Sequence, residues 1–350
     1  MPSLFSRHPL VLQTAHAELR RQAGEQPFLL AGTPGSVGTR TVKGCEYLYR
    51  QFYDAQGKKA AQYIGPVGDP EAEARAEAIR QQIELTKGLV RQGRLLAEQG
   101  YQRADRRTGA ILAALVNRSF FAAGATLVGS HAFGALLNSL GVETAAYRTE
   151  DVDIARGRRL ELALPNDEGF LDVLRESTVP LAPIPALDRK APSTSYKPPG
   201  LDPLRVDLLI PARGRRIETR EVPELKAHAT ALPYLAYLLV DPADAIVISR
   251  ETVVPVKVPR AERFAWHKML VSQLRETTSE KRSKDVSQAA VLVSVLAEDA
   301  PDALFEAADD MPRGARSETR RGADRVRSAL EAAGDERALD VLSEAMSTRR

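Results

Sequence analysis

The feature that most constrains this chain is a pair of carboxylates in an alternating, strand-like stretch, Asp151-Val152-Asp153-Ile154. Side chains two residues apart on a strand point to the same face, so Asp151 and Asp153 are expected to project together while their apolar neighbours face a core. A third acid, Asp207, has the same apolar flanks in Val206-Asp207-Leu208. We therefore expect it on a neighbouring strand, in a sheet that carries a cluster of oxygen ligands on one surface.

A second motif lies upstream of the paired acids. The small-residue run 123–128 is typical of a short buried strand, and it breaks at Gly129-Ser130, ahead of a helix expected from His131 to Leu140. A glycine lets backbone amides approach a phosphate, the serine hydroxyl adds a donor, and the helix N-terminus adds positive potential. His131 follows the turn, where it is equally suited to contact a nucleotide or to cap and pack the helix.

The three carboxylates suit Mg²⁺, with Mn²⁺ as its substitute, because Mg²⁺ prefers oxygen ligands and binds carboxylates together with substrate phosphates. Each motif is weak alone, since acidic pairs are common on solvated strand edges and Gly-Ser is an ordinary connection between a strand and a helix. Their conjunction predicts a metal site beside a phosphate-binding turn. That is the arrangement needed to move a nucleotidyl or phosphoryl group.

Composition narrows the class of protein. A 350-residue chain with 43% hydrophobic and 27% charged residues is ordinary for a soluble globular protein with room for two domains. The net charge of +3 excludes a polycation that coats nucleic acid nonspecifically. The single cysteine, Cys45, excludes an intrachain disulfide and a thiolate metal site, which fits a reducing cytoplasm. No signal pattern is visible, and Asn117-Arg118-Ser119 interrupts the longest apolar stretch, so we expect a cytoplasmic protein with no membrane contact.

The order of the predicted elements indicates an α+β fold in three parts. Residues 1–105 are expected to form an arm made of a helix, a β-hairpin around Gly57 and a long helix that starts near Asp69-Pro70. Residues 106–259 alternate strands and helices, which predicts a mixed sheet core with flanking helices. Residues 260–350 have helical periodicity throughout and are expected to form a helical domain.

The hairpin is rich in aromatic and basic residues. It contains Tyr47, Tyr49, Phe52, Tyr53 and Tyr63, interleaved with Lys43, Arg50, Lys58 and Lys59. This composition is typical of a nucleic-acid platform, in which aromatic faces stack on bases while cations meet phosphates. Alternation sends three of the tyrosines to one face, which a hairpin packed on its long helix would also show. Packing is the interpretation that we favour from the sequence.

The order of an apolar residue, a Gly-Ser turn, a short helix, Asp-x-Asp and a later third acid resembles the nucleotidyltransferase superfamily, whose best-known branch is the DNA polymerase β-like enzymes. The matching residues are Val128-Gly129-Ser130, Asp151-Val152-Asp153 and Asp207. The chain departs from the pattern in one respect, because the twenty residues between Ser130 and Asp151 are more than is usual in the superfamily. The resemblance implies a nucleotidyltransferase-type mixed sheet for the core.

A narrower resemblance, to a bacterial family of nucleotidyltransferase-like proteins, covers most of the chain. The stretches that carry it are Lys43–Tyr49, Gly57–Lys59, Tyr63–Pro66, Gly129–Phe133, Thr149–Ala155, Arg205–Leu209 and Phe264–Lys268. It implies the same fold and chemistry and leaves the acceptor open.

The superfamily resemblance also implies a mechanism. Asp151 and Asp153 would hold two Mg²⁺ ions about 3.5–4 Å apart, as two-metal sites generally do. One ion would neutralise the triphosphate and the leaving pyrophosphate. The other would lower the pKa of an acceptor hydroxyl, with Asp207 as a metal ligand and general base.

The nucleotide-binding residues implied by the resemblance are Gly129, Ser130, His131, Lys268 and Lys284. The Gly129 amide and the Ser130 hydroxyl would hold the β- and γ-phosphates of a nucleoside triphosphate. Lys268 and Lys284 lie where superfamily members carry a basic helical wall over the triphosphate. The alternative for these lysines is an ordinary solvated helix face with mixed charge.

The implied activity is Mg²⁺-dependent transfer of a nucleoside monophosphate from a nucleoside triphosphate, ATP among the candidates, to a hydroxyl acceptor. RNA, and tRNA in particular, ranks ahead of a protein or small-molecule acceptor because of the hairpin and the basic helices. Two other classes stay open. A noncatalytic nucleic-acid-binding module on this scaffold would be indifferent to the loss of Asp153. A metal-dependent nucleotide-sugar glycosyltransferase would explain Asp-x-Asp but not the Gly-Ser turn.

Overall fold

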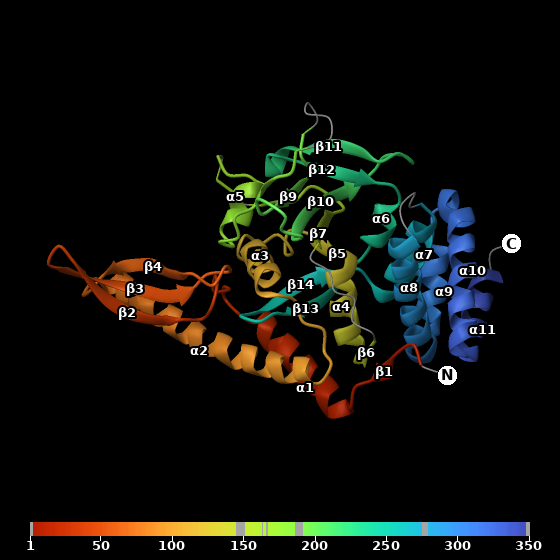
Figure 1. Cartoon of the computed structure of the whole chain (residues 1–350), viewed down its shortest axis with the longest axis horizontal. Coiled ribbons are helices and arrows are strands. Elements are labelled where there is room, and N and C mark those ends of the chain that lie inside the picture. The colour runs from red at the N-terminus through yellow and green to blue at the C-terminus, as the bar shows by residue number, and fades with distance from the viewer. Residues whose placement is uncertain are drawn as a thin grey trace.

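The computed structural model describes residues 3–144, 151–162, 164–165, 167–185, 192–274 and 279–347. Figure 1 shows an arm at one end, a sheet with flanking helices in the middle and a group of helices at the other end. The mixed parallel and antiparallel sheet confirms the predicted α+β class. No helix among the described residues is both long and apolar enough to cross a bilayer. The predicted domain boundaries stay predictions.

The arm consists of two helices and a small sheet. Asp69 starts the long helix, because its carboxylate accepts the Ala72 backbone N–H at 2.9 Å and Pro70 fits the first turn. The sequence predicted a hairpin of two strands, whereas the structure has a third strand, β2 (Ser36–Val42), before it. Gly38 lies in this strand, and glycine is disfavoured in strands, so the sequence indicated the strand only weakly. The elements are α1 (Leu10–Gly24), β2 (Ser36–Val42), β3 (Cys45–Tyr53), β4 (Lys59–Pro66) and α2 (Pro70–Glu98).

The arm sheet packs on α2 through the face opposite to its tyrosines. Leu48 and Ile64 form a small core with Ala72 and Ala76 of α2. Arg50 is buried on the same face, where its guanidinium donates to the backbone carbonyls of residues 31, 33 and 34. The prediction that the tyrosines pack on the long helix is therefore wrong, and so is Arg50 as a phosphate contact. The reason is that strand alternation gives the helix the even-numbered residues of β3.

The central sheet has β10 in its middle and β7 beside it. It has the strand order β11-β12-β10-β7-β5, with β7 antiparallel to β5 and parallel to β10. Alternation buries Val152, Ile154, Val206 and Leu208 completely, so these strands form the sheet because their apolar face meets a core. The strands are β5 (Ala125–Val128), β7 (Asp151–Arg156), β8 (Ala182–Pro183), β9 (Ser195–Lys197), β10 (Arg205–Pro211), β11 (Glu218–Val222) and β12 (Ala227–Leu232).

Helices and a two-stranded sheet surround the central sheet (Figure 1). The helix predicted from His131 to Leu140 begins two residues earlier, at Gly129, and ends at Gly141, which takes the left-handed conformation that favours glycine. These elements are α3 (Arg106–Asn117), α4 (Gly129–Leu140), α5 (Phe170–Arg175), a 3₁₀ turn (Pro223–Leu225), α6 (Leu235–Leu238), β13 (Ala243–Ile248) and β14 (Val253–Val258).

The C-terminal region is helical, as predicted. Its α7 is buried along most of its length, and Trp266 donates its indole N–H to the Leu304 carbonyl at 2.9 Å. Phe264 of α7 stacks on Phe133 of α4 with ring centroids 6.1 Å apart, which fixes α7 beside the central region. The elements are α7 (Ala261–Leu274), α8 (Ser279–Asp299), α9 (Pro301–Asp309), a 3₁₀ turn (Arg313–Ala315), α10 (Arg316–Ala333) and α11 (Glu336–Ser347).

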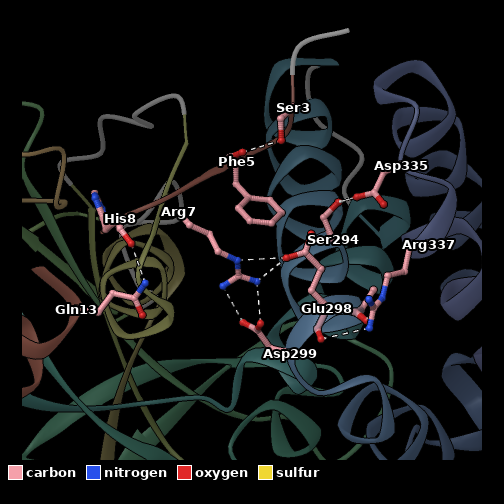
Figure 2. A network of polar contacts seen from close by, with 11 residues as sticks. Ser3, Phe5, Arg7, His8, Gln13, Ser294, Glu298, Asp299, Asp335 and Arg337 are labelled. Carbon is pink, nitrogen blue, oxygen red and sulfur yellow. Dashed lines mark hydrogen bonds and ion pairs between the residues drawn. The ribbon is translucent and has the colours of Figure 1, made fainter. Parts of the chain in front are cut away.

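A short N-terminal strand connects the central region to the C-terminal helices. β1 (Ser6–Arg7) pairs with β6 (Val142–Glu143), which follows α4. Figure 2 shows the Arg7 guanidinium between Glu298 and Asp299 at the end of α8, at 2.6 and 2.7 Å. Two acids at the negative end of a helix dipole favour a cation there. The strand therefore connects the end of α4, through β6, to the end of α8.

Candidate functional site

Gly129 connects β5 to α4 in a conformation that only glycine adopts easily. Its φ of +69° lies in the left-handed region, and a Cβ atom there would lie 2.1 Å from Asp153 Oδ2. The Asp153 carboxylate thus lies directly against the turn. Ser130 and His131 follow in the first helical turn, whose backbone N–H groups have no partner within the helix. The turn and the acid are therefore one unit.

The sheet register places the three candidate acids on adjacent strands. Asp153 is the direct neighbour of Asp207 across the parallel β7–β10 pair, and Asp151 is the neighbour of Arg205. Asp151 is exposed, while Asp153 and Asp207 are half-buried. Asp207 thus lies on a strand beside the Asp-x-Asp motif. In the stretch Thr149–Ala155, Thr149 and Glu150 lie outside the described residues.

The environment of Asp153 opposes its ionisation. Burial, together with the nearby Asp207 and Asp151 carboxylates, raises its pKa to about 7, against the opposing effect of Lys268 and Arg205. A carboxyl group that holds a proton near neutral pH is common in functional sites, because folding alone gains nothing from it. The electrostatics of Asp153 therefore depend on both neighbouring acids.

Asp207 forms an ion pair with Arg205, which lies on the same strand. Arg205 Nε donates to Asp207 Oδ1 at 2.6 Å, and Arg205 Nη2 donates to Ser195 Oγ at 2.7 Å. Among the residues that the structure describes, no group of three or more His, Cys, Asp or Glu side chains is arranged to hold a metal ion. The three acids lie on two adjacent strands, and among the described residues they do not converge as the ligands of one metal ion.

Lys268 of α7 lies within electrostatic reach of Asp153, because it lowers the pKa of that carboxyl. It is buried, and its ammonium binds Asp285 Oδ1 of α8 at 2.7 Å and lies 5.2 Å from the centre of the Phe264 ring. Sequence reasoning missed Asp285, because it ends a run of mixed charge that is typical of a solvated helix face. The structure turns this acid inward. Contact of Lys268 with a nucleotide stays a prediction.

His131 is neutral at physiological pH. Burial lowers its pKa to about 4, with Asp105 opposing and Lys284 of α8 adding to the shift. Lys284 therefore lies close enough to act on the turn. The Nε2 atom of His131 is buried and has no hydrogen-bond partner among the described residues. Ser130, His131, Lys268 and Lys284 thus belong to helices α4, α7 and α8, which meet near Asp153.

A cavity of about 1020 Å³ extends from Ser130 and His131 along α4 to the segment that joins α2 to α3. Asn138 fixes that segment, because its side-chain amide exchanges two hydrogen bonds with the Gln102 backbone, at 2.7 and 2.9 Å. Four arginines line the cavity, and sequence reasoning missed all of them: Arg103, Arg106, Arg107 and Arg250. The run Arg103-Ala-Asp-Arg-Arg107 was the signal that could have found three of them.

Two of these arginines are tied to acids. Arg106 binds Glu251 at 2.7 Å, and Arg107 binds Asp202. Arg103 and Arg250 are exposed, and their backbones lie close together because Arg103 forms a β-bridge with Ile248, two residues before Arg250. Among the residues that the structure describes, the cavity lining therefore has a net positive charge, with four arginines against one acid, Asp105.

A protein-family model described as nucleotidyltransferase matches residues 106–312, which is more than half of the chain. The chain belongs to the nucleotidyltransferase family. No curated protein and no solved structure gives a match. The superfamily resemblance is thereby confirmed, and nucleotidyl transfer is the general activity that the family supports. The matched part of this nucleotidyltransferase contains the Gly-Ser turn, the three acids and both lysines, whereas the arm lies outside it.

Proposed function

We propose that this nucleotidyltransferase moves a nucleoside monophosphate from a nucleoside triphosphate, such as ATP, to a hydroxyl acceptor in a Mg²⁺- or Mn²⁺-dependent reaction. RNA, with tRNA first, is the favoured acceptor. The observation that carries the proposal is the position of Asp153. Its carboxylate lies against the Gly129 turn and next to Asp207 on the neighbouring strand. The N–H groups at a helix N-terminus suit a phosphate, and neighbouring carboxylates suit a cation. A site that binds both explains why the acids lie beside the helix N-terminus.

The residues fit a divalent cation. Carboxylate oxygens are the ligands that Mg²⁺ prefers, and a cation would offset the burial and the repulsion between carboxylates that together raise the pKa of Asp153 to about 7. Asp151, Asp153 and Asp207 would hold it, with Asp207 exchanging its bond to Arg205. When bound, the cation neutralises phosphate charge and lowers the pKa of the acceptor hydroxyl.

Residues of the protein deprotonate the acceptor and hold the phosphates. Asp207 takes the proton of the acceptor hydroxyl, whose oxygen then attacks the α-phosphorus. A new phosphate–oxygen bond forms as the bond to pyrophosphate breaks. The backbone amide of Gly129 and the hydroxyl of Ser130 hold the β- and γ-phosphates, and Lys268 and Lys284 oppose the charge of the leaving pyrophosphate. His131, being neutral, offers its Nε2 atom as a hydrogen-bonding group and adds no charge.

The family match favours nucleotidyl transfer over glycosyl transfer. A noncatalytic nucleic-acid-binding module remains the alternative, and a direct assay separates the two. Full-length protein is incubated with each labelled nucleoside triphosphate, Mg²⁺ and total cellular RNA. We expect label on RNA, loss of transfer on chelation of the metal, and a loss of about 100-fold or more in Asp153→Asn.

A matched variant tests whether the loss is specific. Asp244→Asn removes another strand carboxylate, on β13, which is 79% exposed and pairs only at the surface with Lys257. We expect it to transfer label as the wild type does. If no nucleotide labels any acceptor, or if Asp153→Asn equals the wild type, the enzymatic proposal fails and the binding-module alternative replaces it.

A further inference from the structure

The arm sheet presents one face made of aromatic and basic side chains. The antiparallel register sets Arg40 opposite Tyr47, Tyr49 opposite Tyr63 and Tyr53 opposite Lys59. Directly opposite residues on a sheet share a face. We define the tyrosine face as these six residues, Arg40, Tyr47, Tyr49, Tyr53, Lys59 and Tyr63. The strand register puts no carboxylate on this face, because Glu46 alternates to the other side.

The tyrosine face is open to solvent, because the core that the sheet shares with α2 lies on its other face. Tyr53 and Tyr63 are 46% and 54% exposed. The rings contact one another, with Tyr63 centred 5.9 Å from Tyr47 and 5.4 Å from Tyr49. The Arg40 guanidinium lies 5.4 Å from the Tyr49 ring centre. Large aromatic rings exposed together on one sheet mark an interaction surface.

The chemistry of the face selects its ligand. Tyrosine rings stack on bases of any sequence, and arginine and lysine beside them meet the phosphates between the bases. A sheet that carries aromatic side chains on one face is a recurrent surface for single-stranded RNA. A protein partner would also use tyrosine and arginine, but the lack of any acid on the tyrosine face and the nearby transferase site favour a polyanion.

One end of the tyrosine face is fixed beside the cavity. Tyr53 leads directly into the turn 54–58, of which Ala55 and Gln56 line the cavity that contains Ser130 and His131. The turn is held to the central region by the Ala55 N–H and the Gln56 amide, which donate to Thr178 at 3.1 Å each. Figure 1 shows the opposite end of the sheet projecting away from the molecule. The face therefore runs from the end of the arm towards the site.

We propose that the tyrosine face binds single-stranded RNA by base stacking and directs it through the arginine-lined cavity to the Gly129-Ser130 turn. From Tyr47 to Tyr53 the strand rises about 20 Å, which spans several stacked bases. Arg103 and Arg250 then meet the phosphates that enter the cavity. The role as acceptor rests on the proposed function, whereas the binding itself does not.

The test measures binding without chemistry. A fluorescein-labelled, unstructured RNA of roughly 12 nucleotides is titrated with the full-length protein, and its anisotropy is recorded without nucleotide. Tyr49→Ala with Tyr63→Ala is expected to weaken binding by about 10- to 100-fold, because each lost stack costs about tenfold. Tyr49→Phe with Tyr63→Phe keeps both rings and is expected to bind within about twofold of the wild type.

A second pair of variants tests the cations. Arg40→Ala with Lys59→Ala removes two phosphate contacts and is expected to reduce the slope of log K against log salt by about 1.4. Arg80→Ala with Lys87→Ala is the matched control. It removes the same charge from exposed positions of α2 in the same arm, where each cation pairs with a neighbouring glutamate. We expect the control to leave the slope unchanged.

The outcomes separate this inference from the proposed function. Asp153→Asn that still binds RNA but transfers nothing agrees with both. RNA binding that depends on the tyrosines, without any transfer by the wild type, supports the face and overturns the function. The inference is overturned if the wild type does not bind RNA, if the alanine pair binds as the wild type does, or if the phenylalanine pair is as weak as the alanine pair. Circular dichroism on each variant confirms that the arm is folded.

Discussion

Replacing Gly129 by alanine should separate backbone strain from loss of the site. At φ +69° a side chain costs about 1–2 kcal/mol in the folded state. Alanine also restricts the unfolded chain, which offsets about 0.4–1 kcal/mol of this cost. The backbone alone therefore predicts a loss of about 1 kcal/mol in the free energy of unfolding.

The second effect of Gly129→Ala is on Asp153. The added methyl would lie 2.1 Å from Asp153 Oδ2, whereas an ordinary contact begins near 3.4 Å, so the carboxylate must move by about 1 Å. A displacement of that size in a reacting group costs about 100-fold in rate. We therefore expect Gly129→Ala to lose about 100-fold in nucleotidyl transfer while it remains folded.

Gly141 offers a matched control at the other end of the same helix. Its φ of +67° is almost the same, and its added methyl would meet the flexible side chain of Gln13 at 2.7 Å. Gly141→Ala should lose a similar amount of stability and keep transfer within about threefold of the wild type.

Denaturant unfolding measures stability, and label transfer at saturating nucleotide measures activity. The double variant of Gly129→Ala with Asp153→Asn should be no less active than Asp153→Asn alone, because both changes act on one carboxylate. The reasoning fails if Gly129→Ala transfers label at a near wild-type rate. It also fails if Gly141→Ala loses as much activity, since backbone strain alone would then explain the loss.

Two further predictions follow from the charges around the site. The pKa of Asp153 is raised in the folded state to about 7, so between about pH 4 and 7 the folded protein holds a proton that the unfolded chain releases. The stability of the wild type relative to Asp153→Asn should therefore fall as pH rises through this window. Denaturant unfolding at pH 5 and pH 8 measures this fall, and Mg²⁺ should restore stability at pH 8 in the wild type only. Asp285→Asn breaks the buried ion pair with Lys268 and should lower the unfolding free energy by about 3 kcal/mol. Asp310→Asn breaks a pair with Arg263 in which the Asp310 side chain is 58% exposed, so it should cost less than about 1 kcal/mol. Equal losses would refute the burial argument.

The sequence predicted the parts of the site whose physics is local. The Asp-x-Asp strand alternates strictly, so its period alone assigned Val152 and Ile154 to the core and the acids to the other face. Asp207 was assigned to a neighbouring strand for the same reason, and it pairs with Asp153. The start of α2 at Asp69-Pro70 was predicted because capping depends only on adjacent residues.

Features that depend on distant packing could not be predicted. The face of the arm sheet that meets α2 was assigned wrongly, because alternation divides the residues into two faces without saying which one is covered. The burial of Arg50 depends on three carbonyls of the preceding loop. Likewise Asp285 is buried only because Lys268, seventeen positions earlier and on another helix, reaches it. The pairing of Arg7 with α8 spans nearly the whole chain.

The two protein cations near Asp153 are already paired with other carboxylates, so they do not neutralise Asp153. Lys268 and Arg205 are the two cations that oppose the raised pKa of Asp153, and each already binds another carboxylate, Asp285 and Asp207 respectively. Neither can neutralise Asp153 without giving up its present bond. A proton or a divalent cation resolves this conflict, and near neutral pH the two compete for the same oxygen atoms. Transfer should therefore require more Mg²⁺ for half-maximal rate at pH 6 than at pH 8, and a requirement independent of pH would place the cation away from Asp153.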